Sequence, residues 1–298
     1  MRAIILGGSG FIGRGLENGF DERGWETFIL TRREPKRPNE IQWDGVSGAA
    51  WADLVDESTV LVNLAGASVA QRWTPVVRQL LKDSRVLPSK AMVEACADRR
   101  PAMVVQASAI GIYGPSGDEA TEDTPPSDDF LGRLAVEWEE ASAPFDQMGV
   151  PRAIARIGIV LEKDGGMLGK MAPPFRFFVG GPLGNGRQCI PWVHREDLVQ
   201  ALLLMIDRRL AGPYNIVAPN PVSMDEFART LGKILGRPAL FRAPAFVLRA
   251  MFGEMADYTI LAGRPVSGQK LTDAGFQYRY ERLEEALRAI FSRSSEAA

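Results

Sequence analysis

The segment GGSGFIG, at residues 7–13, follows the short apolar run at residues 3–6 directly. Two glycine patterns fit it: G-x-G-x-x-G through Gly8, Gly10 and Gly13, and G-x-x-G-x-x-G through Gly7, Gly10 and Gly13. Glycine permits positive φ and a close approach of the backbone to a pyrophosphate, and the amides of a following helix face the phosphates. Glycine also serves purely structural turns, but the position between a strand and a helix favours dinucleotide binding.

A pair of arginines, Arg32 and Arg33, follows the next apolar run at residues 26–31. NAD sites usually place Asp or Glu about 20 residues beyond the glycines, where it binds the ribose 2′-hydroxyl. A carboxylate would repel a 2′-phosphate, whereas a guanidinium pairs with it through charge-assisted hydrogen bonds. Two arginines after a strand are also common as solvated surface charges. Together with the glycine turn, they favour NADP (NADPH) as the cofactor.

Alternating strands and helices must position these groups. Apolar runs predict strands at residues 2–6, 26–31 and 59–66, from 102 and from 152, with shorter ones near 41 and 213–217. Helical spacing of apolar residues predicts helices at 11–23, 75–99, 131–148 and 196–208. This alternation predicts an α/β fold with a doubly wound parallel Rossmann sheet.

The second part of the chain has a different texture. Residues 162–192 are rich in glycine and proline, lack a clear period and are predicted to be loop-like. Helices are expected at 224–235, 245–254 and 281–291. We therefore expect an NADP-binding Rossmann domain of residues 1–161 with 190–218. Residues 162–189 with 219–298 would form a smaller, mainly helical C-terminal substrate lobe.

The composition excludes several classes of function. The chain has 298 residues, 46% of them hydrophobic and 24% charged, with a net charge of -2, so nothing indicates a nucleic-acid partner. One histidine and two cysteines cannot supply a zinc site, and no metal is expected. Isolated thiols suit a reducing compartment, and no apolar segment reaches the roughly 18 residues of a membrane helix. We expect a cytoplasmic protein with a small-molecule substrate and no membrane partner, and leave a homodimer open.

Four motifs carry a family resemblance: GGSGFIG, LVNLAGA at 61–67, SAIGIYG at 108–114 and PWVHREDLV at 191–199. With them the chain resembles the extended short-chain dehydrogenase/reductase superfamily. The segments DGGMLGKMAPPFR and KLTDAGFQYRYERLEEAL are similar to its atypical epimerase-like branch, which is often named NAD-dependent epimerase/dehydratase or cell-division-inhibitor-like and ends in a domain of unknown function. The resemblance spans nearly the whole chain and implies a Rossmann domain that binds NADP, but no defined substrate.

The resemblance also implies site residues. The cofactor-binding set is Gly7, Ser9, Gly10, Phe11, Ile12, Gly13, Thr31, Arg32, Arg33, Ala65, Gly66, Ala67 and Arg156. Ser108 matches the catalytic serine that binds the reacting oxygen of the substrate. The substrate residues that we expect are Lys170, Arg187, Gln188 and His194, although His194 lies in a motif that mainly ties the two lobes together.

One part of the superfamily pattern is missing. The Tyr-x-x-x-Lys pair, in which tyrosine transfers a proton and lysine lowers its pKa, aligns with FLGRL, so Phe130 and Leu134 stand in its place. Tyr113 is the candidate for the missing acid, with a packing role as the alternative. The leading hypothesis is an NADP(H)-binding oxidoreductase or epimerase-like protein that acts on a small carbonyl or alcohol. A non-catalytic NADPH sensor or partner-binding module is the alternative, and a nucleotide-sugar epimerase or dehydratase the third.

Overall fold

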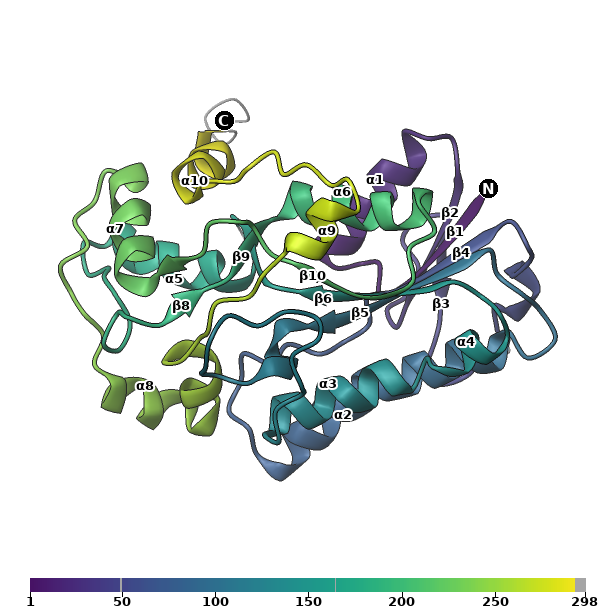
Figure 1. Ribbon diagram of the computed structural model, residues 1–298, viewed down its shortest axis with the longest axis horizontal. Helices are drawn as coiled ribbons and strands as arrows, with labels where there is room; N and C mark the ends of the chain where they lie inside the picture. The colour runs from purple at the N-terminus through teal and green to yellow at the C-terminus, as the bar shows by residue number, and fades with distance from the viewer. Residues whose placement is uncertain (49, 164, 293–298) are drawn as a thin grey trace.

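Seven parallel strands form the central sheet of the computed structural model, which describes residues 1–48, 50–163 and 165–292 (Figure 1). The strands are β1 (Arg2–Leu6), β2 (Glu26–Thr31), β3 (Glu40–Gln42), β4 (Thr59–Asn63), β5 (Met103–Ala109), β6 (Arg152–Ile157) and β10 (Gly212–Ile216). Their order is β10-β6-β5-β4-β1-β2-β3, so the winding direction reverses between β1 and β4. The predicted doubly wound parallel sheet is confirmed, and its central strands β1 and β4 are almost wholly buried because helices cover both faces.

Two groups of helices cover the sheet (Figure 1). One face carries α1 (Phe11–Asp21), α6 (Arg195–Asp207) and α9 (Gln269–Asp273), and the other carries α2 (Pro75–Ala95), α3 (Phe130–Glu140) and α4 (Pro144–Gln147). Glycines let α1 approach α6 closely, because a Cβ at Gly19 would lie 2.7 Å from Leu203 Cδ1. No helix in the described ranges is long and apolar enough to cross a membrane.

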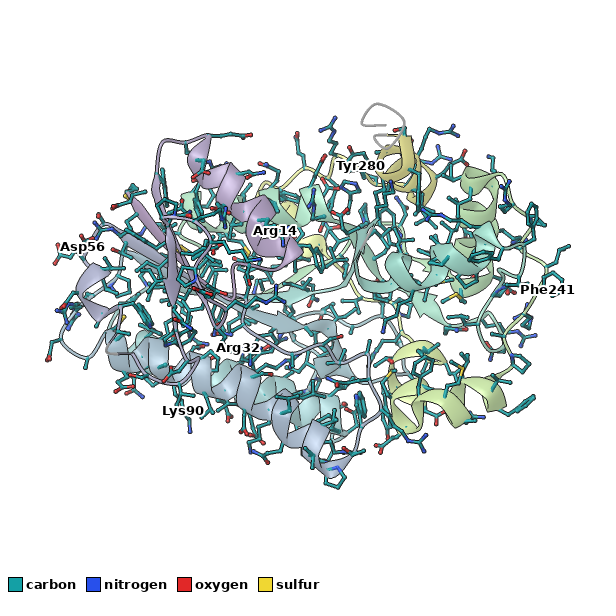
Figure 2. All side chains as sticks on the ribbon, turned by 180° about the vertical axis from the view of Figure 1, so that it is seen from behind. Arg14, Arg32, Asp56, Lys90, Phe241 and Tyr280 are labelled. Carbon is teal, nitrogen blue, oxygen red and sulfur yellow. The ribbon has the colours of Figure 1, made fainter. Side chains whose placement is uncertain are left out.

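A second lobe has its own core. Helices α5 (Gly166–Arg176), α7 (Met224–Leu235) and α10 (Leu283–Ser292) contribute to it, whereas the apolar side chains of α8 (Ala245–Phe252) and the π-helical η3 (Ala256–Ile260) pack near Trp73 and Leu81. Two small sheets pair β7 (Ile159–Glu162) with β9 (Trp192–His194), and β8 (Cys189–Ile190) with β11 (Val222–Ser223). Phe175, Trp192 and Phe227 are fully buried in this core. Figure 2 shows Phe241 of this lobe and Asp56 of the sheet lobe at opposite ends of the molecule.

The loop predicted over residues 162–192 is wrong in its first half, which forms α5. Leu168, Met171 and Phe175 recur at helical spacing and are buried in the core of the second lobe. Two prolines lie inside this helix, and each costs about 3 kcal/mol in a helix interior. Burial of the apolar face therefore outweighs the local propensity that the prediction followed.

The strand predicted from residue 152 is divided at Gly158. Residues before it pair in the main sheet as β6, whereas β7 after it pairs with β9. A Cβ at Gly158 would lie 2.7 Å from Val217 Cγ1 and 2.8 Å from the Pro191 carbonyl oxygen, so this crossing requires glycine. The helix predicted at 131–148 is likewise divided into α3 and α4.

Candidate functional site

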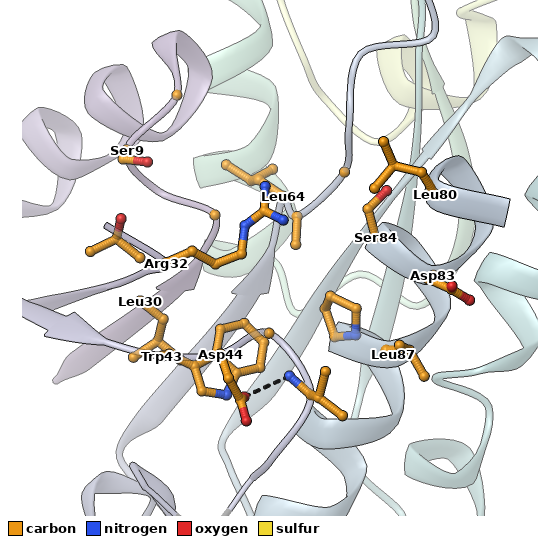
Figure 3. Close-up of a pocket in the computed structure, with 18 residues that line it drawn as sticks. Ser9, Leu30, Arg32, Trp43, Asp44, Leu64, Leu80, Asp83, Ser84 and Leu87 are labelled. Atoms are coloured by element: carbon orange, nitrogen blue, oxygen red, sulfur yellow. Dashed lines mark hydrogen bonds between the residues drawn. The ribbon is translucent and has the colours of Figure 1, made fainter. Parts of the chain in front are cut away.

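A cavity of about 320 Å³ opens at the carboxyl ends of β1, β2 and β4, where the winding of the sheet reverses (Figure 3). Open α/β sheets bind ligands at such reversals. The lining residues come from five segments: Gly7, Ser9 and Gly10; Leu30, Thr31 and Arg32; Trp43, Asp44, Gly45 and Val46; Leu64, Ala65 and Gly66; and Leu80, Asp83, Ser84, Leu87 and Pro88 of α2. The structure thus brings together seven of the thirteen residues predicted to bind the cofactor.

The glycines of the first turn serve different purposes. Gly7 has φ +74°, and a Cβ there would lie 2.8 Å from Ala65 Cα. A Cβ at Gly13 would lie 2.3 Å from the Gly8 carbonyl oxygen. Gly10 has φ −76°, and its Cβ would come no closer than 3.7 Å to the chain outside its own neighbours. The fold therefore requires Gly7 and Gly13, whereas Gly10 leaves room for something that enters the cavity.

The start of α1 fits an anionic group. Gly10 is the N-cap residue, no side chain caps the helix there, and its first turn carries no acidic residue. The first amides of a helix have no partner within the helix and carry the positive end of its dipole. A phosphate group beside Gly10 would accept hydrogen bonds from these amides and be stabilised by the helix dipole.

The two arginines after β2 have different positions. Arg32 lines the cavity, and Figure 3 shows its side chain extending among the lining residues. It pairs with no carboxylate in the described part of the chain. Arg33 is exposed and does not line the cavity, and its backbone amide donates to Thr31 Oγ1 at 3.2 Å. Arg32 is thus the arginine placed to bind an anion there.

The segment after β3 was not predicted to line the site. Its Trp43 Nε1 donates to the Ser47 carbonyl at 2.5 Å. Asp44 Oδ1 accepts the backbone amides of Ser47 and Val46, which hold the pKa of Asp44 below its usual range. Figure 3 draws the bond to Val46. A carboxylate on the cavity wall therefore stays ionised. The signal in the sequence is slight: Gly45, with φ +87°, marks the turn, but β3 has only three residues.

The other six predicted cofactor residues, among them Gly13 and Arg33 described above, do not line the cavity. Phe11 and Ile12 are half-buried at the start of α1. The Ala67 amide donates to Ser84 Oγ at 2.9 Å, which joins the turn after β4 to α2. Arg156 is not at the cavity but beside Ser108 on the paired strand β6.

Ser108 and Arg156 share one carboxylate. Ser108 Oγ donates to Glu139 Oε1 at 2.6 Å, and Arg156 forms two hydrogen bonds of 2.9 Å with the two oxygens of the same group. Ser108 is 2% exposed, and the side chains of Arg156 and Glu139 are 9% and 11% exposed. The serine hydroxyl is therefore bound within the protein.

Tyr113 extends this buried network. Its hydroxyl donates to Asn215 Oδ1 at 2.7 Å and accepts from Arg156 Nη1 at 2.9 Å. The residue is 2% exposed, and its burial raises the pKa of the phenol, so the proton is held more tightly than in water. The structure brings the two predicted catalytic residues together through Arg156, away from the cavity lining.

No proton-transfer group stands at the first position of the Tyr-x-x-x-Lys alignment, and no cation at the second. Phe130 begins α3 and packs edge-on against Trp73, with ring centroids 5.1 Å apart. Leu134 is 6% exposed in the same apolar cluster, together with Leu81. These positions contribute packing between α2 and α3.

The four predicted substrate residues have separate surroundings. Lys170 reaches from α5 to the Ala70 carbonyl at 3.1 Å, across to the loop that follows β4. Gln188 is buried, and its Nε2 donates to the carbonyls of Leu183 and Ile260. Arg187 is exposed. Only Lys170 approaches a segment that continues into the cavity wall.

His194 lies at the junction of the lobes. Its Nδ1 accepts the Glu196 amide at 3.1 Å as the N-cap of α6, and its ring centroid is 4.0 Å from that of Tyr280. In the same helix, the Asp197 carboxylate accepts the backbone amides of Arg279 and Tyr280 at 2.9 and 3.0 Å. These contacts fasten the C-terminal segment to α6.

Comparisons with known proteins agree with this architecture. The model of the NAD dependent epimerase/dehydratase family matches residues 3–133, and that of a domain of unknown function (DUF1731) matches residues 243–290. Epimerase family protein MT2273 of Mycobacterium tuberculosis is 36% identical over 286 residues, which cover 95% of each chain. The chloroplastic SDR39U1 homolog of Arabidopsis thaliana is 35% identical over 97% of this chain and 86% of its own.

A solved structure is similar over almost the whole length. The crystal structure of human epimerase family protein SDR39U1 (isoform 2) with NADPH has a TM-score of 0.89 and 33% identity, and the alignment covers 98% of this chain and 99% of that one. MoeE5, at 21% identity and a TM-score of 0.83, shares the fold. From the sequence relatives and these shared features we conclude that the chain belongs to the epimerase family.

Proposed function

We propose that this protein binds NADP(H) and is an oxidoreductase-like enzyme that acts on a small carbonyl or alcohol without the Tyr-x-x-x-Lys pair. The observation that carries the proposal is the cavity at the winding reversal, which joins the open position at Gly10 to Arg32, a side chain without an ion-pair partner among the described residues. The similar human structure that contains NADPH supports the choice of cofactor. The Rossmann domain would comprise residues 1–161 with 190–218, and residues 162–189 with 219–298 would form the substrate lobe.

Different residues of the cavity would bind different parts of the cofactor. Gly10 and the first amides of α1 would hold the pyrophosphate, and Arg32 would pair with the 2′-phosphate. Arg33 would add long-range attraction from the surface. When bound, the nicotinamide supplies or accepts a hydride.

The proton that accompanies the hydride needs a source. Ser108 remains the proposed group that orients the reacting oxygen, and it would have to exchange Glu139 for the substrate. The Tyr113 hydroxyl already donates to Asn215, and its raised pKa opposes proton release. Water that enters with the substrate is therefore a better proton source than Tyr113.

The test begins with binding. Fluorescence titration of the wild type with NADPH and NADH should show tighter binding of NADPH, and tighter binding of NADH would overturn the assignment. A panel of carbonyl compounds should then oxidise bound NADPH with transfer of one of its two C4 hydrogens, followed with deuterated cofactor. Ser108→Ala should slow this transfer without changing NADPH affinity.

A non-catalytic NADPH sensor is the second candidate. It is favoured by the internal pairing of Ser108 and Tyr113 and by the apolar packing of Phe130 and Leu134. If the wild type binds NADPH but no carbonyl or nucleotide sugar oxidises the bound NADPH in single-turnover experiments, the sensor hypothesis replaces the enzyme hypothesis. A partner that binds with NADPH but not with NADP⁺ would then be expected.

A further inference from the structure

Arg85 on α2 is buried between the backbone of Gly66 and the ring of Trp138. A Cβ at Gly66 would lie 3.3, 3.4 and 3.5 Å from its Cζ, Nη2 and Nε atoms, so the plane of the guanidinium faces Gly66. On another side, Cζ lies over the Trp138 ring, 5.0 Å from its centroid. Arg85 is 9% exposed. A Cβ at position 66 would force the guanidinium to shift by a few tenths of an ångström, so this close approach favours glycine.

The guanidinium has unused donors. Nη1 donates to the Leu81 carbonyl at 3.0 Å and, at 3.5 Å, to Ser84 Oγ, and Nη2 donates to the Ala67 carbonyl at 3.0 Å. Arginine has five N–H donors, so Nε–H and one Nη2–H have no acceptor within the described ranges. The neighbouring Trp138 Nε1, also buried, has none there either. Donors without acceptors thus accumulate at this place.

The charge of Arg85 is uncompensated as well. No carboxylate of the described chain forms an ion pair with it, and burial lowers the pKa of Arg85 to about 10, with no neighbouring charge opposing the shift. The side chain is still protonated at neutral pH. Arg156 provides the contrast, because it is equally buried but bound twice to Glu139. A buried cation without a counter-ion is unfavourable and calls for a partner from outside the chain.

The position of Arg85 indicates that partner. Gly66 and Ser84, which it contacts, both line the cavity, whereas Arg85 lies directly behind them. We propose that Arg85 is an electrostatic positioning residue in the wall of the site and that the anionic dinucleotide is its counter-ion. Through the Ala67 carbonyl it also holds the turn that faces the cofactor. This inference rests on the proposed function.

The same arrangement relates Arg85 to the missing lysine. Leu81 of α2 and Leu134 of α3 belong to one apolar cluster. Arg85 and Trp138 follow them by four residues on their helices and contact each other. Leu134 stands where the superfamily has its lysine. One turn further along α3, Trp138 contacts Arg85 of α2, so a fixed cation lies near the position of the missing one. It serves as a fixed charge and not as a proton carrier, because arginine keeps its proton at neutral pH.

The test compares Arg85→Met with Arg78→Met. Arg78 lies on the same helix but pairs with Glu254, so its charge is compensated. Arg85→Met should weaken NADPH binding about tenfold or more, while Arg78→Met should change it less than about twofold. In competition titrations, the loss in Arg85→Met should grow with ligand charge, small for adenosine and large for 2′,5′-ADP. An equal loss for adenosine and 2′,5′-ADP would reduce Arg85 to a structural support and overturn the proposal.

Two further measurements separate charge from shape. Arg85→Lys keeps the charge and should recover most of the affinity that Arg85→Met loses, whereas equally poor binding by both variants would contradict the proposal. Without ligand, Arg85→Met should unfold at the same temperature as the wild type or higher, and NADPH should raise that temperature less. Failure of the wild type to bind NADPH would overturn the proposed function itself. Normal NADPH binding by Arg85→Met would overturn this inference alone.

Discussion

Two polar regions at the carboxyl edge of the sheet differ in how their groups are partnered. At the ends of β1 and β2, Gly10 leaves open space and Arg32 has no ion-pair partner in the described chain. At the ends of β5 and β6, Glu139 joins Ser108 to Arg156, and Arg156 donates to the Tyr113 hydroxyl, which itself donates to Asn215. Groups satisfied within the protein stabilise the fold, and groups left open on a cavity wall are available to a ligand. Four experiments test this difference.

The largest effect is expected within the glycine turn. Gly13→Ala would place a methyl group 2.3 Å from the Gly8 carbonyl oxygen, so we expect a loss of several kcal/mol of folding free energy, measured by urea unfolding. Gly10→Ala meets no such contact and should fold normally but lose NADPH binding by about tenfold or more, because the methyl occupies ligand space. Unchanged NADPH affinity in Gly10→Ala would remove Gly10 from the binding site.

The next largest effect concerns Arg156. Arg156→Met would leave Glu139 buried without its cation, which typically costs about 3–5 kcal/mol. Urea unfolding should show this loss, and Arg32→Met should be as stable as the wild type because Arg32 is exposed. A stable Arg156→Met variant that binds NADPH poorly would instead support the cofactor role implied by the family resemblance.

Cofactor choice should depend on Arg32. Arg32→Ala should weaken NADPH binding by about 10- to 100-fold, the worth of a charge-assisted contact to phosphate, and leave NADH binding nearly unchanged. Arg33→Ala serves as the matched control, and its smaller effect would reflect long-range attraction alone. Equal losses for NADPH and NADH in Arg32→Ala would contradict pairing with the 2′-phosphate.

The smallest effect is expected for Tyr113→Phe. Loss of the hydroxyl deprives Asn215 and Arg156 of one partner each and should cost about 1 kcal/mol. Because folding raises the pKa of Tyr113, its contribution to stability is complete below pH 10.0 and is lost as the pH rises through the folded value. The free energy of unfolding should therefore fall more steeply above pH 10.0 in the wild type than in Tyr113→Phe. If the free energy of unfolding falls equally steeply with pH in both proteins, the Tyr113 phenol is not the group held protonated by burial.

Much of the sheet was predictable because buried parallel strands read as continuous apolar runs. The bounds of β1 and β2 agree with the prediction to the residue. In α5 the burial of Leu168 and Phe175 decided the structure against the local signal of its prolines. The family resemblance placed Arg156 among the cofactor-binding residues, which stays a prediction, and the structure pairs its side chain with Glu139.

The sequence predicted the residues of the cavity wall only where they directly follow a predicted strand. Ser9, Gly10 and Arg32 lie in turns that directly follow strands, so their position at the sheet edge follows from the strand pattern. Trp43 and the α2 side chains reach the cavity because a three-residue strand and a long helix pack beside it. No period or motif in the sequence encodes that packing.

The sequence by itself determined the fold class, the glycine turn and the arginines after the second strand, because each depends on neighbours a few residues apart. Tertiary structure alone decided which polar groups are satisfied. Tyr113 and Asn215 are 102 residues apart in the chain, and Ser108 and Glu139 are 31 apart. Arg85 faces Gly66 only because α2 returns across the turn after β4. Hydrogen bonds and ion pairs act over a few ångströms, so folding, and not spacing along the chain, determines whether a charged group stabilises the protein or remains available to a ligand.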